Sequence, residues 1–268
     1  MICLAAACMW GALCLTFWLG SWQLLYHPLS AVATTPDSAG MAFQSVDFAP
    51  SQAGRSQLHG WWIPASSKSR FTAIYLHGAD GNIGDTIQWL TPLHFADLNV
   101  LVFDYRGYGT SVFDRPSEAN WLDDAESAIT YLKSTRHIPP DSILLVGTRL
   151  GADLALEVGA AHPEIAGIVL DHPLADADDA VLNDPRARLV PARWLMRDRW
   201  SLREPASALK IPSLWLLAKQ RAVAQLAALN GSYDLITARK QRIWRDDSDS
   251  KLASEPLTRW LDDLGKNP

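Results

Sequence analysis

A long run without any charge opens the chain. Between residues 2 and 26 there is no Asp, Glu, Lys or Arg, and only Thr16, Ser21 and Gln23 interrupt the apolar pattern apart from two glycines. As a helix this run would measure roughly 37 Å, whereas the hydrocarbon core of a bilayer is about 30 Å thick. We therefore predict that residues 1–26 form a single-pass anchor that holds the protein in a membrane.

A signal peptide or a buried core helix would also show such an apolar run. Ala31-Val32-Ala33 has the small-x-small form of a cleavage site, and cleavage there would leave Thr34 as the first residue. However, the run is longer than the about 7–15 apolar residues of a signal peptide, and no basic residue precedes it. The first Lys or Arg is Arg55, so the charge bias that orients a membrane helix is absent and either side of the membrane fits. Three aromatic side chains suit the headgroup layer at the end of the run, which favours the anchor: Trp18, Trp22 and Tyr26.

Beyond this run, apolar and β-branched segments alternate with segments of helical period. Residues 27–41 are polar and contain proline, so we expect them to connect the anchor to a folded domain over residues 42–268. The predicted strands are Phe43–Phe48, Leu58–Ile63, Phe71–Leu76, Val100–Phe103, Ile143–Val146, Ile165–Leu170 and Leu214–Leu217. The predicted helices are Thr86–Ala96, Trp121–Ser134, Leu150–Ala161, Arg221–Leu229 and Glu255–Leu264. This alternation predicts the α/β class, with a mostly parallel sheet and helices on both of its faces.

Composition narrows the function classes. With 48% apolar and 20% charged residues the chain is globular, and its net charge of −5 argues against a nucleic-acid partner, which needs clustered basic residues in excess. All three cysteines lie within the first 14 residues, so the rest of the chain has no disulfide and no thiolate metal site. Residues 174–209 are rich in Asp and Arg and lie between two predicted strands, where we expect a cap-like insertion.

Three strand-to-turn segments follow one another in a characteristic order. They are residues 75–85 (YLHGADGNIGD), residues 103–111 (FDYRGYGTS) and residues 145–151 (LVGTRLG). In order and spacing this series resembles the α/β-hydrolase superfamily, in particular the membrane-anchored serine hydrolases with an N-terminal transmembrane helix. The resemblance extends over residues 42–265 and implies the α/β-hydrolase fold, with a mostly parallel central sheet.

The resemblance also implies where an active site would lie. In that family, one backbone N–H after the HG turn and one after the nucleophile form an oxyanion hole, and these would belong to Ala79 and Leu150. Asp104 and Arg106, in the second segment, are expected to pair and to brace their loop. Backbone donors survive most side-chain changes, so the oxyanion hole is interpreted as vestigial.

The three side chains of the family's catalytic triad are missing. Arg149 stands where the nucleophilic Ser belongs, and a guanidinium has no lone pair with which to attack a carbonyl. Arg221 stands at the place of the acid, and no His occurs after His172, although the triad requires one near the last strand, which is expected at about Ile243–Ser250. The adjacent hydroxyl of Thr148 is a poor replacement, because the elbow projects only its central residue into the cleft. We therefore expect no catalytic residues of the serine-hydrolase kind.

Four further residues of the predicted cleft could carry other chemistry. His77 and Asp80 lie on the oxyanion turn, and Asp171 and His172 end a strand beside the elbow. Water-based hydrolysis through either His is one alternative, and structural histidines with satisfied hydrogen bonds are the other. Carboxylates with these His residues could also hold a metal, but neither H-x-x-x-H nor H-E-x-x-H spacing occurs. We predict neither a metal nor a cofactor.

The positive charge of Arg149 is electrostatically unfavourable at its predicted place. The first N–H groups of the following helix already make the cleft positive, so an added guanidinium is unfavourable without a negative group nearby. Asp80 and Asp171 are the expected partners. A bound phosphate or carboxylate could neutralise the guanidinium instead. In the simplest alternative, the guanidinium turns out to solvent.

Basic residues collect in one part of the predicted cap. Residues 186–203 contain six Arg and the acidic residue Asp198, interleaved with apolar side chains such as Trp194 and Trp200. A solvated helix would show this pattern, and so would a face that lies near anionic headgroups. The sequence therefore favours a membrane-anchored α/β-hydrolase-fold pseudoenzyme that binds an anionic ligand or a protein partner. An ester, thioester or lipid hydrolase with a non-standard site is the alternative.

Overall fold

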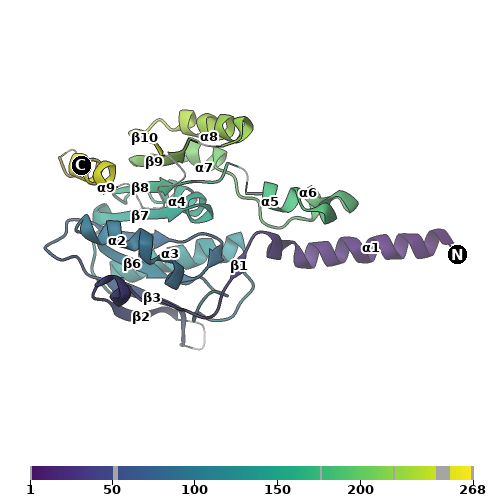
Figure 1. Cartoon of the computed structure of the whole chain (residues 1–268), viewed down its shortest axis with the longest axis horizontal. Coiled ribbons are helices and arrows are strands. Elements are labelled where there is room, and N and C mark those ends of the chain that lie inside the picture. Colours follow the sequence, from purple (N-terminus) through teal and green to yellow (C-terminus); the bar gives the residue numbers. More distant parts are fainter. Residues whose placement is uncertain (1, 51–53, 176, 220, 246–253, 267–268) are drawn as a thin grey trace.

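The computed structural model describes residues 2–50, 54–175, 177–219, 221–245 and 254–266. Its main sheet has eight strands in the order β10-β9-β8-β7-β4-β6-β3-β2 (Figure 1). Neighbouring strands from β10 to β6 are parallel, and β3 and β2 are added antiparallel at one edge. In chain order the strands of this sheet are β2 (Gln44–Pro50), β3 (Ser56–Ile63), β4 (Thr72–Leu76), β6 (Asn99–Phe103), β7 (Ile143–Thr148), β8 (Gly167–Asp171), β9 (Ser213–Ala218) and β10 (Lys240–Arg245).

Helices cover both faces of this sheet. On strand β4, Ile74 and Leu76 point into one apolar cluster while Ala73 and Tyr75 point into the other, as the alternation of side chains along a strand requires. Helices α3 (Glu118–Ser134), α4 (Leu150–Ala161) and α8 (Val223–Leu235) contribute to the first cluster. Helices α2 (Ile87–Phe95) and α9 (Ser254–Lys266) contribute to the second. The predicted fold class is thereby confirmed.

The predicted elements are present, with shifted ends in places. Helix α8 continues to Leu235 rather than to Leu229, and α3 begins at Glu118, where Ser117 accepts a hydrogen bond from the Asn120 N–H as its N-cap. The last strand, β10, starts before the predicted Ile243. Its first residues, Lys240, Gln241 and Arg242, lack the apolar pattern by which a strand is predicted, because charged and polar side chains are usual on an edge strand. Residues 246–250 of that prediction lie outside the described part of the chain.

The first helix projects from the body of the molecule (Figure 1). Helix α1 covers Ile2–Gly20 and a 3₁₀ turn follows over Ser21–Leu24. The stretch Cys3–Leu24 has a mean hydropathy of 1.7, and 6% of it is buried. It is long and apolar enough to cross a membrane, and it is not packed inside the domain as a core helix would be.

The connector after α1 is built into the domain. Its short strand β1 (His27–Pro28) pairs in parallel with β5 (Asp80–Gly81), which follows the carboxyl end of β4. The described residues of the segment 174–209, which follows β8, form short helices: α5 (Asp179–Leu182), the 3₁₀ helix Pro185–Leu189, α6 (Ala192–Leu195) and α7 (Arg203–Ala208). Trp200 of this segment donates from Nε1 to the hydroxyl of Tyr26 at 3.0 Å. The carboxyl end of the sheet, the cap segment and the base of α1 therefore lie together.

Candidate functional site

The turn between β7 and α4 is the sharp elbow that the sequence predicts. Arg149 occupies its tip with φ +52° and ψ −121°. Two glycines allow the close approach of the backbone segments. A Cβ on Gly147 would lie 2.0 Å from the carbonyl oxygen of Gly151, and one on Gly151 would lie 2.2 Å from the carbonyl oxygen of Leu76. Because neither position has room for a side chain, α4 starts directly against the ends of β4 and β7.

The HG turn lies beside this elbow. A Cβ on Gly78 would be 3.6 Å from the Cβ of Arg149. Leu150 is the first residue of α4, so its N–H has no acceptor within the helix. The N–H of Ala79 donates to no residue in the described part of the chain, whereas its carbonyl oxygen accepts from the Tyr108 hydroxyl at 2.9 Å. Both backbone donors predicted for the vestigial oxyanion hole are thus available to a ligand.

The guanidinium of Arg149 is exposed at a pocket of about 440 Å³. The prediction that Asp80 or Asp171 neutralises it is wrong for the described residues. Asp80 accepts instead from Nδ1 of His27 at 2.8 Å, and Asp171 pairs with other residues at the base of the elbow. Arg149 forms no ion pair within the described part of the chain. The pocket is lined by Leu29, Tyr75, His77, Gly78, Asp80, Gly81, Asn82, Asp85, Thr86, Trp89, Thr148 and Arg149.

Tyr75 is a residue of this pocket that the sequence did not single out. Its side chain is 1% exposed, and its hydroxyl lies close to the side chain of Thr148 but forms no hydrogen bond of good geometry among the described residues. Burial, together with the nearby Asp171 carboxylate, raises the pKa of Tyr75 well above its ordinary range, so the hydroxyl keeps its proton. A buried donor without an acceptor is costly, and an oxygen atom of a ligand in the pocket would satisfy it. In the sequence, only its position two residues before His77 could have indicated this role.

Asp171 and His172 meet a cation that the sequence analysis did not assign to the site. Nδ1 of His172 lies 2.7 Å from Oδ1 of Asp171, and Nη1 of Arg245 lies 3.2 Å from the same oxygen. Arg245 and Asp171 are 5% and 3% exposed, so this is a buried ion pair at the ends of β8 and β10. The carboxylate that could orient a catalytic His is therefore held by an Arg from the strand after which the family places its His.

Arg221, which stands at the place of the family's acid, does not line the elbow pocket with Arg149. Its Nη1 donates to the carbonyl oxygen of Pro173 at 2.9 Å, and it is absent from the lining of the elbow pocket. It lies near the buried Asp153, whose Oδ1 accepts from the Leu174 N–H at 2.9 Å. Arg221 thus supports the start of the cap segment.

His77 points away from solvent into an aromatic cluster. Its ring centroid is 4.4 Å from that of Tyr105 and 5.3 Å from that of Tyr108. Nδ1 donates to the Gly78 carbonyl oxygen at 2.8 Å, while Nε2 lies 3.8 Å from Oδ1 of Asp104, beyond hydrogen-bonding distance. Burial lowers the pKa of His77 to about 4, so its ring is neutral at pH 7. This environment gives His77 a structural place rather than that of a base.

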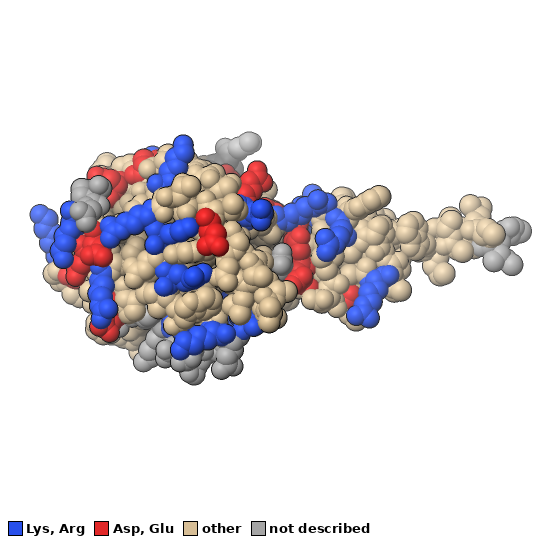
Figure 2. Space-filling view, turned by 90° about the horizontal axis from the view of Figure 1, so that it is seen from above, with Lys and Arg blue, Asp and Glu red and all other residues tan. Residues whose placement is uncertain are grey.

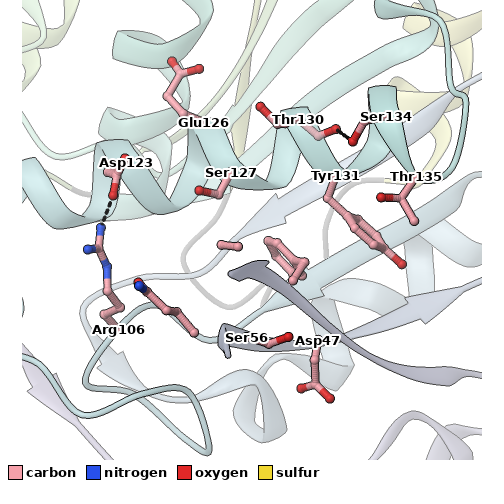
Figure 3. A pocket seen from close by; sticks show the side chains of 13 residues that line it. Asp47, Ser56, Arg106, Asp123, Glu126, Ser127, Thr130, Tyr131, Ser134 and Thr135 are labelled. Atoms are coloured by element: carbon pink, nitrogen blue, oxygen red, sulfur yellow. Dashed lines mark hydrogen bonds and ion pairs between the residues drawn. The ribbon is translucent and has the colours of Figure 1, made fainter. Parts of the chain in front are cut away.

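A second pocket, of about 680 Å³, lies between α3 and the strands β2 and β3 (Figure 3). Hydroxyl and carboxylate side chains line most of it, and Arg106 reaches it from the loop after β6. The expected pair of Asp104 and Arg106 is not formed. Arg106 binds Asp123 at 2.5 Å and Asp124 at 2.6 Å, because both carboxylates face its loop from α3. Asp104 instead accepts the N–H of Ile83 at 2.8 Å.

The chemistry that these groups offer is the binding of an anion. The elbow pocket combines an exposed guanidinium and a buried phenol, both of which donate. The N–H groups of Ala79 and Leu150 belong to the residues that follow the lining residues Gly78 and Arg149. The residue at the tip of the elbow is Arg149, whose guanidinium cannot act as the nucleophile of the family's reaction. Within the described ranges, no three His, Cys, Asp or Glu side chains come together as a metal site.

Most of the chain matches one known protein family. Residues 67–260 match the family described as Serine aminopeptidase, S33. Among curated proteins, the chain is 30% identical over 211 residues to the uncharacterised protein YfhR of Salmonella typhimurium, which covers 72% of the chain and 70% of YfhR. Over 107 residues it is 35% identical to the alpha/beta hydrolase domain-containing protein aho-3 of Caenorhabditis elegans, a match of 40% of the chain and 32% of aho-3.

Solved structures agree with the fold. An esterase of Pyrococcus furiosus superimposes with a TM-score of 0.67 and 18% identity, over 90% of the chain and 97% of the esterase. An α/β-hydrolase of Vibrio vulnificus gives a TM-score of 0.65 and 19% identity, over 86% and 82% of the two chains. At these identities the similarity concerns the fold alone.

Proposed function

Because the chain belongs to the serine aminopeptidase S33 family of α/β-hydrolase-fold proteins, we propose that it uses the family's cleft to bind an anionic ligand and not to hydrolyse an ester or peptide. The observation that carries this proposal is Arg149. It occupies the position of the nucleophile, with the strained backbone of an elbow, and presents a cation to a pocket of about 440 Å³.

The ligand's negative end belongs at the elbow. There the guanidinium of Arg149, the N–H groups of Ala79 and Leu150 and the hydroxyl of Tyr75 can each donate to a carboxylate or a phosphate. The lining also includes Asp80 and Asp85, which bind His27 and the Asn82 N–H respectively. A ligand that combines an anionic group with hydroxyl or amino donors matches both kinds of lining residue.

The proposal places the protein in a membrane by residues 1–26. The packing of residues 26–34 supports an uncleaved anchor. Tyr26 is 1% exposed and contacts Trp121 at 5.3 Å between ring centroids, and Nδ2 of Asn82 donates to the carbonyl oxygens of Leu29 and Ala31. Cleavage after Ala33 would remove these groups and leave the aromatic cluster and the wall of the pocket incomplete.

Loss of catalysis is tested with the purified full chain. We expect no labelling by a serine-directed fluorophosphonate and no turnover of a short p-nitrophenyl ester. Arg149→Ser should not restore activity, because no His stands ready to take the proton of the new hydroxyl. Turnover well above background that a single change of a pocket residue abolishes would contradict the proposal and favour the non-standard hydrolase.

Anion binding is tested with inorganic phosphate as the probe. Phosphate should raise the midpoint of thermal unfolding of the full chain in detergent, and Arg149→Ala should remove most of that rise. Lys68→Ala is the matched control, since Lys68 is exposed before β4, at the opposite end of the sheet. An equal rise in all three proteins would show that phosphate acts elsewhere.

Membrane anchoring is tested by carbonate extraction of cells that express the full chain. The protein should stay in the membrane pellet, with an N-terminus that precedes Tyr26. Release to the supernatant, or a mature protein that begins at Thr34, would show that residues 1–33 are a signal peptide.

A further inference from the structure

The cap reaches along the apolar helix. Here the cap lobe means residues 185–200, which comprise the 3₁₀ helix Pro185–Leu189 and α6. The indole N–H of Trp10 donates to the carbonyl oxygen of Leu189 at 3.1 Å, and the guanidinium of Arg197 lies 5.1 Å from the ring centroid of Trp18. The lobe therefore lies against the domain half of α1, from Trp10 to the base of the helix.

Because of this contact, α1 cannot span a membrane while the lobe stays in water. Only residues 2–9 of α1 extend beyond the contact at Trp10, and eight helical residues measure about 12 Å. A hydrocarbon core of about 30 Å cannot be crossed by that length. If α1 enters a bilayer while the lobe stays in place, the lobe must enter the same leaflet.

The surface of the lobe suits that position. Leu189 is 60% and Trp194 84% exposed, so the lobe presents two large apolar side chains at its surface next to α1. Between them and around them the lobe carries five arginines and one acidic residue, Asp198, which is half-buried and accepts the N–H of Glu118. Arg186 is paired with Asp184 just before the lobe. Figure 2 shows Lys and Arg side chains on the part of the molecule between the main body and the projecting helix.

The arginines of the lobe differ in their contacts. Arg188 and Arg193 are exposed and form no ion pair within the described residues, and Arg199 donates to the carbonyl oxygen of Arg193 at 2.9 Å. Arg115 faces the same region, 5.7 Å from the ring centroid of Trp22. Arg side chains are long enough to reach phosphates at the headgroup level from apolar surroundings, so cations around an inserted Trp and Leu are compatible with one leaflet.

We propose that the cap lobe is a lipid-contacting surface that inserts Leu189 and Trp194 into the leaflet entered by α1 and binds anionic headgroups through Arg188, Arg193 and Arg197. This inference rests on the membrane anchoring proposed above, but not on the ligand of the elbow pocket. It places the carboxyl end of the sheet, and with it the elbow pocket, towards the membrane surface.

The test measures the depth of three positions in vesicles that contain the full chain. An environment-sensitive fluorophore is attached to Cys8 in α1, to Leu189→Cys in the lobe, or to Phe95→Cys at the end of α2, each time with the other native cysteines changed to Ala. Phe95 is the matched control, because it is 78% exposed and lies away from α1. Nitroxide-labelled lipids in phosphatidylcholine vesicles, with or without phosphatidylglycerol, then quench whichever fluorophore contacts the bilayer.

We expect the fluorophore at position 189 to be quenched to within about twofold of Cys8 and at least about fivefold more than position 95. Joint reversal of Arg188, Arg193 and Arg197 to Glu should lower the quenching at position 189 at least about twofold and remove its dependence on phosphatidylglycerol. Reversal of Lys68, Lys210 and Lys266, exposed at the other end of the molecule, should leave it unchanged. Arg193→Glu alone provides a milder variant, since its exposed side chain makes no ion pair within the described ranges.

Two results would overturn the proposal in distinguishable ways. Strong quenching at Cys8 with none at position 189 would mean that the anchor inserts and the lobe does not. Absence of quenching at Cys8 would refute the anchoring and the lobe contact together, while the phosphate test of the elbow pocket would keep its meaning.

Discussion

Arg149 keeps the backbone of a nucleophile elbow with a side chain that is not a nucleophile. Its φ of +52° is strained for a residue with a Cβ and costs roughly 1–3 kcal/mol. The surroundings impose this conformation, because the N–H of Arg149 donates to the Asp171 carbonyl oxygen at 2.9 Å and the two flanking glycines admit α4. The elbow therefore depends on its neighbours and not on the residue at its tip.

The pKa values of two buried groups near the elbow are shifted in opposite directions. Burial lowers the pKa of His77 from 6.5 to about 4 and raises that of Asp104 from 3.8 to about 7. Between pH 4 and 6.5 the folded protein holds a neutral His and a protonated Asp, whereas the unfolded chain holds the charged form of each. Both states then bind the same number of protons through this pair, so its two contributions to the pH dependence of stability cancel.

Single substitutions should uncover these contributions. In Asp104→Asn only His77 remains, and since the unfolded state then binds the extra proton, stability should fall as the pH falls from 6.5 towards 4. In His77→Gln only Asp104 remains, and stability should fall as the pH rises from 3.8 towards 7. Each slope, relative to the unsubstituted protein, should approach about 1.4 kcal/mol per pH unit. Urea unfolding at several pH values measures it, and variants that stay parallel to the unsubstituted protein would refute the assigned shifts.

The buried pair of Asp171 and Arg245 should matter more for stability than the exposed Arg149. We expect Asp171→Asn to lower the free energy of unfolding by about 3 kcal/mol, because it removes the negative charge that lies 3.2 Å from the buried guanidinium of Arg245. Arg149→Ala should change it by less than about 0.5 kcal/mol, as is usual for exposed side chains. Denaturant unfolding compares the two, and the double variant Asp171→Asn/Arg245→Met should recover part of the loss. Equal effects of the two single substitutions would contradict this assignment.

At the scale of elements, the site exists because α4 begins in contact with the strand ends. The loop after β6 is held in a similar way, since Arg106 binds two carboxylates of α3. Helix α8 has a glycine in a different situation. A Cβ on Gly231 would meet nothing within 4 Å, in contrast to one on Gly151.

These two glycines give a matched pair of substitutions. Gly151→Ala should destabilise the domain by about 3 kcal/mol or more, because its Cβ meets rigid backbone at the end of β4 and α4 must move. Gly231→Ala should stabilise it by up to about 1 kcal/mol, because Ala favours the helix and no contact opposes it. Thermal unfolding of both variants tests this. A mild effect at Gly151 would mean that α4 can move away from the sheet without loss.

At the scale of the whole molecule, the segment after α1 joins this helix to the domain core. Tyr26 is buried against Trp121, and its hydroxyl accepts from Trp200 of the cap segment. The same residue therefore contacts the end of α1, helix α3 and the cap. Its position fixes the direction in which α1 leaves the domain.

Tyr26→Ala in the full chain should cost about 3–5 kcal/mol of stability, as the removal of a large buried aromatic side chain does. Phe95→Ala is the control, since Phe95 is 78% exposed, and it should change stability by less than about 0.5 kcal/mol. Unfolding in urea with detergent present measures both. If Tyr26→Ala were as mild as the control, residues 26–34 would be an attachment to the domain rather than a part of it.

The sequence by itself predicted the α/β class, a helix long enough to span a membrane, the order of strands and helices, and an Arg at the tip of the elbow. These follow from hydrophobic period, from glycines at fixed spacing and from the chemistry of single side chains, all of which are local properties. Edge strand β10 was located less well, because its charged face lacks the apolar pattern of the central strands.

Only the tertiary structure decided which charges meet. The sequence suggested that Asp171 would neutralise Arg149, but the fold brings Arg245, 74 residues along the chain, to that carboxylate and leaves Arg149 exposed. It also directs Arg106 to Asp123 and Asp124 and lays the cap lobe against α1. Such pairings depend on the packing of elements distant in sequence, and Coulomb energies depend on distance and burial, which residue order along the chain does not specify.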